Sequence, residues 1–259
     1  MALKFKNSIK KILIILFWLF VWEISSIIIN KPLLFPSPIK VLIRLSQLII
    51  TNEFLISSFA SLGRIGIGIL IAIISGSIVA IICSFSKLVY EFIHPIITVI
   101  KATPVASFII LIWIFIGNNI TPIFISSLMV FPIVFSNLYQ GIISVDKDLM
   151  EVCKIYNLPR KKIIRSLYIP SVIPYFFSAL LSSIGLGWKA GIAAEVLCTP
   201  NNSIGKSIFE SKTYIEYIDL FAWTSSVIIL SLLFEFTVTK LIKIILKKHT
   251  YYKVNPDGN

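Results

Sequence analysis

The sequence predicts an all-α protein that crosses a membrane six times, and three observations support this prediction. Of the 259 residues, 57% are apolar and only 14% are charged. A soluble protein of this size has about 25% charged residues, so this chain has too few charges to cover a surface exposed to water. The apolar residues also gather in six runs, each near the roughly 20 residues that a helix needs to cross a bilayer. We therefore expect a polytopic helical membrane protein.

The six predicted spans are separated by polar segments. We place the spans at residues 12–29, 59–83, 95–117, 120–143, 171–197 and 220–245. The basic start and apolar run of the first could be a signal peptide, but the run is long and no small-residue cleavage site follows, so we interpret it as a retained helix. After it, Pro32, Pro36 and Pro38 predict an extended entry to a short interfacial helix. Residues 144–170 and 198–219 are predicted to be polar loops.

The basic residues predict the orientation of the chain. Its 24 Lys and Arg outnumber its 12 Asp and Glu, and most of them fall in segments on the same side as the N-terminus. Cytoplasmic loops collect Lys and Arg, so both termini should lie in the cytoplasm and the protein in a bacterial inner membrane. The charge therefore points to a lipid bilayer and not to nucleic acid. We divide the chain into residues 1–57, a core at 58–246 and a basic cytoplasmic tail at 247–259.

The sequence shows no chemistry of an enzyme. Cys83, Cys153 and Cys198 lack metal-binding spacing, and the chain has only two histidines. Gly205-Lys206-Ser207 looks like the end of a nucleotide-binding loop, but Pro200 stands where that loop needs a glycine. We expect no catalytic residue, no metal site and no directly bound cofactor.

Small residues recur every four positions in two of the predicted spans. Such spacing lets helix backbones approach closely in a membrane. It predicts packing seams inside one bundle, and their use as a subunit interface stays open. Pro104 and Pro132 are expected to kink their spans. The seam residues are Gly68, Ala72, Gly76, Ala80 and Ser84 in the second span, and Ala179, Ser183, Gly187 and Gly191 in the fifth.

Lys189 is the ionisable residue placed deepest in a predicted span. Charged groups inside a membrane usually face water or the protein interior. A pore-facing lysine would favour an anionic solute, whereas the alternative is an ion pair with Glu23 or Glu235. We place Lys189 in a candidate translocation path, and we group Pro104, Trp188 and Glu195 with it there, although Glu195 lies near a helix end and also suits a structural role.

The loop at residues 144–170 predicts a projecting knob. Its first half has helix-favouring residues with acids at the start, and Asn157 suits a left-handed helix stop. Pro159 can then begin a second short helix, which carries Arg160 and further basic residues. The alternative is a solvated basic loop.

This loop resembles the signature loop of the permease subunits of bacterial ATP-binding-cassette importers. The family pattern is Glu-Ala-Ala, three residues, Gly, nine residues, an aliphatic residue, one residue, then Leu-Pro. This chain matches every interval, with Glu151 and Pro170 identical, and Asn in place of Gly keeps the left-handed turn accessible. The positions that differ are Val152, Cys153, Asn157 and Ile169.

The resemblance covers nearly the whole chain. Four more segments are similar to those of type I importers, the last of them to the nitrate/sulfonate/taurine-type branch. They are Phe35–Pro38, Ser61–Arg64, Lys101–Gly117 and Gly185–Glu195.

The resemblance implies a permease that acts with partner subunits. It implies a cytoplasmic ATPase subunit that binds ATP and magnesium, an extracytoplasmic solute-binding protein docked on residues 30–57 and 198–219, and a second permease copy, with a homodimer expected. It implies import of a small anionic solute of the nitrate, sulfonate or taurine kind, while bicarbonate and thiamine-type precursors stay open. The residues implied in coupling to the ATPase are Glu151, Val152, Cys153, Asn157, Leu158, Arg160 and Pro170.

Two other functions compete with this interpretation. An ion-coupled secondary transporter could also have six helices, but the halves show no similarity and a relay would need more than Lys189. A membrane-embedded enzyme would need a nucleophile or a metal cluster, and the sequence shows neither.

Overall fold

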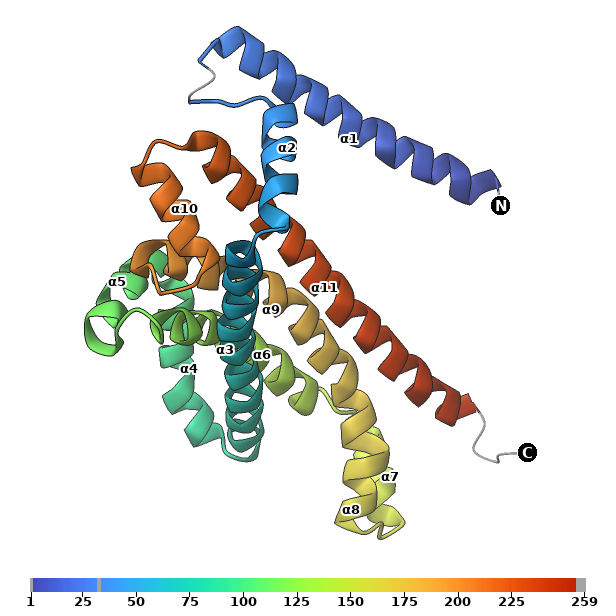
Figure 1. Cartoon of the computed structure of the whole chain (residues 1–259). Coiled ribbons are helices and arrows are strands. Elements are labelled where there is room, and N and C mark those ends of the chain that lie inside the picture. The colour runs from blue at the N-terminus through green and yellow to red at the C-terminus, as the bar shows by residue number, and fades with distance from the viewer. Residues whose placement is uncertain (1, 32–33, 255–259) are drawn as a thin grey trace.

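The computed structural model describes the backbone at residues 2–31 and 34–254 and the side chains at residues 10, 13–31, 34–242 and 244. Pro32 and the end of the predicted tail lie outside the described residues. Within them every regular element is a helix, as Figure 1 shows. The elements are α1 (Ala2–Ile29), α2 (Pro38–Ile49), α3 (Asn52–Phe85), α4 (Lys87–Ala102), α5 (Val105–Ile116), α6 (Thr121–Ile143), α7 (Lys147–Ile155), α8 (Arg160–Ile163), the π-helical turn η1 (Ile164–Tyr168), α9 (Ile169–Cys198), α10 (Ile204–Thr213) and α11 (Tyr217–Val254).

The structure confirms an all-α membrane protein. In the described chain, 4 helices are long and apolar enough to cross a membrane, or up to 5 if the bent pair α4–α5 is one span. The apolar part of α1 described here, Leu13–Ile29, is shorter than these. The number of six spans therefore stays a prediction.

The predicted third span is not one straight helix. The chain bends by 106° between α4 and α5. Pro104 lies at this break, because proline lacks a backbone N–H and disfavours a helical conformation at the preceding residue, Thr103. The prediction of a break at Pro104 is confirmed, whereas a single span over 95–117 stays a prediction, because α4 and α5 meet the length and composition of a span only when taken together.

Three other predicted boundaries differ in the structure, two of them because of hydrogen bonds at helix starts. The Thr51 side chain accepts a hydrogen bond from Phe54 N at 3.2 Å, so α3 begins at Asn52 and takes residues that we had placed in the outer segment. Ser203 accepts from Lys206 N at 3.1 Å and begins α10 inside a segment predicted to be a loop. The last helix, α11, continues to Val254, well into the predicted tail.

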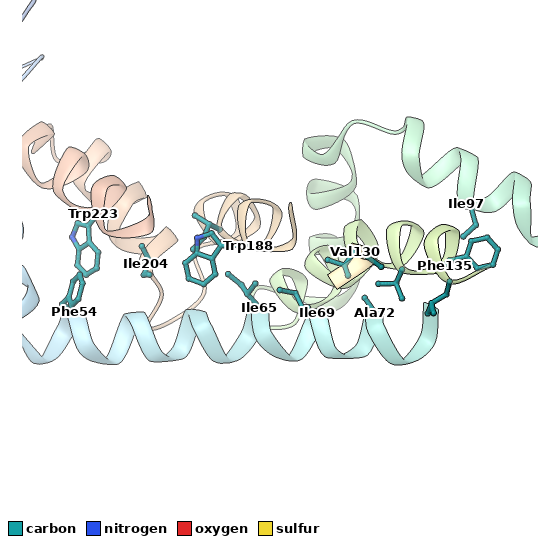
Figure 2. Close-up of a cluster of buried hydrophobic side chains, with 14 of the residues drawn as sticks. Phe54, Ile65, Ile69, Ala72, Ile97, Val130, Phe135, Trp188, Ile204 and Trp223 are labelled. Carbon is teal, nitrogen blue, oxygen red and sulfur yellow. The ribbon is translucent and has the colours of Figure 1, made fainter. Parts of the chain in front are cut away.

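The core lies where α6 packs between α3 and α9. The small residues of the two seams are buried there, apart from the half-buried Ser84, so the seams pack inside one chain as predicted. A Cβ added to Gly187 would lie 2.7 Å from Cγ2 of Val130, which shows how closely α9 approaches α6. Figure 2 shows Ile65, Ile69 and Ala72 along α3, pointing toward side chains of the other helices.

The two ends of the bundle carry different elements. In Figure 1, α2 and α10 lie at one end and α7 and α8 at the opposite end. We call the end with α10 the outer end and the end with α7 the inner end. The helix α1 extends away from the rest of the bundle beyond α2.

Candidate functional site

The predicted knob is a sharp turn at the inner end of the bundle. Asp146 begins α7 by accepting hydrogen bonds from the backbone at Asp148 and Leu149. At the other end of α7, Asn157 has φ 49°, the left-handed conformation expected for it. The backbone N–H of Asn157 then donates to Lys154 at 2.9 Å, and that of Leu158 to Cys153 at 3.0 Å. This pair of bonds is a Schellman motif, which ends the helix and reverses the chain.

The second arm of the knob is not an isolated short helix. Helical structure runs without a break from Arg160 to Cys198, so α8 is the inner end of the helix that becomes α9. The π-helical turn η1 comes just before Pro170, whose missing N–H prevents a regular hydrogen bond to the preceding turn. The knob is thus joined directly to a membrane-crossing helix.

The knob exposes apolar side chains at its tip. No residue of α7 is buried, and Ile155 and Tyr156 are 76% and 74% exposed. Among the predicted coupling residues, Glu151, Val152, Asn157 and Arg160 are exposed, whereas Cys153, Leu158 and Pro170 are half-buried. Exposed apolar side chains that are grouped and rimmed by charges mark a binding surface.

Lys189 lies on the one side of α9 that the rest of the described chain leaves open. Gly187 faces α6 and α3, and Trp188 faces α11, where its Nε1 donates to Val227 O at 3.3 Å. Ala190 faces α5 in a cluster with Ile109. Successive helical residues are about 100° apart, so these contacts occupy the other sides of the helix.

The open side of α9 carries polar side chains as well as apolar ones. Its exposed residues are Ser178, Leu181, Ser182, Leu186, Lys189, Ala193 and Leu197. Among the described residues, Lys189 makes no ion pair, so the pairs with Glu23 or Glu235 that sequence reasoning allowed are absent from the described part of the chain.

The other predicted path residues lie in different surroundings. Pro104 is exposed at the α4–α5 bend, on another element. Trp188 is 1% exposed and packs against Phe234 of α11 with ring centroids 6.2 Å apart. Glu195 is fully buried. The structure therefore does not bring these four residues together on one surface of a single copy.

Glu195 forms an ion pair that sequence reasoning missed. Its Oε1 accepts from Arg64 Nη1 at 3.2 Å, and its Oε2 accepts from Ser61 Oγ at 2.6 Å. The sequence did contain a signal for this pair, because Arg64 and Glu195 carry opposite charges and both lie near the outer ends of their predicted spans. However, 131 residues separate Arg64 and Glu195 in the chain, and spacing alone could not pair them.

A second ion pair holds the outer helix α2 to α11. Arg44 donates from Nε and Nη2 to the two carboxylate oxygens of Asp219, at 2.6 and 2.7 Å. This hydrogen-bonded arrangement raises the pKa of the Arg44 guanidinium. The apolar side of α2, with Val41, Leu45 and Leu48, is buried.

An apolar helical bundle with an open polar helix face and a projecting knob defines a membrane transport component. The chain belongs to the family described as "Binding-protein-dependent transport system inner membrane component", whose model matches residues 68–249. It is thus a permease of an importer driven by ATP, and not an ion-coupled secondary transporter.

Named relatives place the chain in one branch of that family. It is 29% identical over 220 residues to the nitrate import permease protein NrtB of Synechococcus elongatus, covering 80% of this chain and 78% of that protein. It is 22% identical to the putative aliphatic sulfonates transport permease protein SsuC of Bacillus subtilis, covering 78% and 74%. It is also 23% identical to the formylaminopyrimidine transport permease protein ThiX of Halalkalibacterium halodurans, covering 74% and 76%.

Proposed function

We propose that this permease imports a small anionic solute as a homodimer, energised by an ATPase subunit that binds the knob. The observation that carries the proposal is the exposed knob at Lys147–Ile163, joined without a break to the helix that carries Lys189. A movement of the knob is therefore transmitted along one helix to the candidate path. ATP and its magnesium bind to the partner subunit, where hydrolysis takes place.

The composition of the knob suits a groove in a partner protein. Val152, Ile155 and Tyr156 offer apolar area, and Glu151 and Arg160 offer charges of both signs beside it. Aromatic and aliphatic anchors with a charged rim are typical of protein interfaces. Because ATP is in the cytoplasm, the proposal puts the knob on that side, and with the six predicted spans both termini would lie there too.

Lys189 supports an anionic solute. Its ammonium is exposed on the open side of α9, with no carboxylate in the described chain to neutralise it. A cation at this depth is costly unless it faces water or an anion. Two of the relatives named above are permeases for nitrate or sulfonates, which are anions. A third relative, ThiX, is a permease for a formylaminopyrimidine, so the relatives differ in their solutes. The charge of Lys189 is therefore the observation that favours an anion for this chain.

A second copy would close the path. The open side of α9 lies between α5 and α11 in one chain, and a two-fold related copy packed across it would enclose a pore lined by Lys189 of both copies. Alternating access is then a switch between two packed states, with ATP favouring one of them.

The outer end supplies a docking surface for a solute-binding protein. The end of α10 and the turn after it expose Phe209, Tyr214 and Ile215, which are 41%, 72% and 65% accessible. With α2, these residues fall in the two outer segments that the sequence assigned to docking.

Co-purification is the experiment that tests the proposal. The tagged protein would be extracted from its native membrane in mild detergent, and its partners identified by mass spectrometry. We expect an ATPase subunit and a binding protein, whose ligand can then be screened among small anions. Recovery of the protein alone, folded and still able to transport, would contradict the proposal.

The knob can be tested by one substitution. Glu151→Arg reverses a charge on an exposed surface, so the bundle should stay folded while ATPase binding and solute uptake fall by at least tenfold. Lys87→Glu, on the exposed first turn of α4, is the matched control and should leave both unchanged. Full uptake by the Glu151→Arg protein would remove that residue from the coupling surface.

A further inference from the structure

The buried carboxylate of Glu195 links three helices at the outer end. In addition to Ser61 and Arg64 of α3, its Oε2 accepts a hydrogen bond from Gly205 N in the first turn of α10, at 3.3 Å. Ser61 Oγ in turn accepts from Ile204 N at 3.0 Å. One carboxylate on α9 and one hydroxyl on α3 therefore hold the start of α10 from two sides.

Arg64 extends the same network to the loop between α9 and α10. Its guanidinium donates to the backbone oxygens of Asn201 and Asn202 as well as to Glu195. Thr199 and Asn202 both have left-handed backbone conformations, with φ 47° and 50°. These two residues turn the chain sharply, and Arg64 fixes the turn by binding its carbonyl groups.

The start of α10 is tightly packed against α9. Ile204 is fully buried, and a Cβ added to Gly205 would overlap Glu195 and Val196 of α9. Ser207 and Ser211, further along α10, are also buried, while Phe209 and Thr213 on its other side are exposed. α10 therefore has one side fixed to the bundle and one side available to a partner.

A buried charged network costs desolvation energy, but its hydrogen bonds fix the relative positions of the helices that it joins. Well-packed apolar residues often stabilise a fold as well as a buried ion pair does. Hydrogen bonds to a carboxylate and a guanidinium are directional, however, and they allow a single arrangement of α3, α9 and α10. Lys189 lies six residues before Glu195 on α9, about 9 Å along the helix.

We propose that Arg64 and Glu195 are positioning residues that lock α10 to α9 and α3, so that a protein docking on α10 displaces the helix that carries Lys189. The proposal rests on the importer function proposed above. Without the lock, a docked partner would move α10 alone, and the path would not respond.

Two measurements on Arg64→Met test the lock and its consequence. Hydrogen–deuterium exchange in lipid nanodiscs should become at least tenfold faster at residues 204–213 and stay unchanged in α6. In the reconstituted complex, stimulation of the ATPase by the co-purified binding protein should fall at least fivefold, with the unstimulated rate within twofold of wild type.

Control variants separate the lock from general damage. Arg64→Lys keeps the charge but not the planar fork, so both readouts should be intermediate. Ser61→Ala keeps the ion pair, so it should change the exchange and the ATPase stimulation in the same direction as Arg64→Met but by less. This variant also tests the lock if Arg64→Met does not fold. Lys87→Met removes the exposed pair with Glu91 and should change neither.

Each result supports or overturns a distinct statement. Unchanged exchange at α10 in Arg64→Met would show that the network does not hold it. Faster exchange with full stimulation would leave the network a purely structural role and overturn the proposal. If the wild-type complex shows no ATPase activity, the importer function fails instead, and the exchange result still reports on the lock.

Discussion

Glu195 and Lys189 lie six residues apart on α9 and show two ways in which a membrane helix accommodates a charge. Glu195 is completely buried, and an arginine, a serine hydroxyl and a backbone N–H satisfy its oxygens. Lys189 is exposed and has no ion-pair partner within the described chain. Because an unpaired charge in a membrane is costly, the first residue serves the fold, and we propose that the second faces the solute path.

Lys189→Met tests this difference at the scale of one residue. It keeps an unbranched side chain, one atom shorter, and removes the charge, so uptake of the anion identified for the binding protein should fall by at least tenfold. Thermal stability in detergent should not fall, because no ion pair is lost. Lys189→Arg should retain most of the uptake. Equal uptake by the methionine and wild-type proteins would remove Lys189 from the path.

At the scale of elements, close contact between helices depends on individual glycines. Gly68 of α3 faces α6 so closely that an added Cβ would overlap the Ser126 side chain and the Ile123 carbonyl. Gly66, two residues earlier on the same helix, has no atom within 4 Å of such a Cβ. The α3–α6 contact therefore relies on the first glycine and not on the second.

Gly68→Ala and Gly66→Ala form a matched pair. Alanine favours a helix over glycine by up to about 1 kcal/mol at both sites. At Gly66 the change should be neutral or stabilising, whereas at Gly68 the overlap should lower the free energy of unfolding by about 1–3 kcal/mol. Denaturation in mixed micelles measures both. Equal stability of the two variants would show that α6 can move away without cost.

At the scale of the whole molecule, the knob and α10 lie at opposite ends of the bundle (Figure 1). If the knob binds a cytoplasmic ATPase, then α10 must face the outside. This orientation also agrees with the excess of Lys and Arg in the segments assigned to the cytoplasm.

Cysteine labelling in intact cells checks this orientation. In a background without Cys153, Tyr214→Cys should react with a membrane-impermeant maleimide, and Tyr156→Cys should react only after the cells are opened. Both side chains are more than 70% exposed in the permease, so in cells that express it without its partner subunits, access to each depends on its side of the membrane. The reverse pattern would invert the topology.

Much of this protein follows from local sequence. Apolar runs predicted most of the membrane helices, small residues every four positions predicted packing seams on α3 and α9, and Asn157 predicted the turn of the knob. These features depend on neighbouring residues along one helix or one turn, so spacing alone reveals them.

The tertiary structure decided what depends on distant residues. It paired Arg64 with Glu195 and Arg44 with Asp219, buried Trp188, and left Lys189 on an open side of α9. It also showed a 106° bend where the sequence predicted a single kinked span. A sequence identifies charged residues and helix breakers, but the partner of a charge and the direction after a break depend on how the helices pack. The pairing depends on packing because a buried polar group is costly without a partner, and the packed helices decide which partner lies within reach.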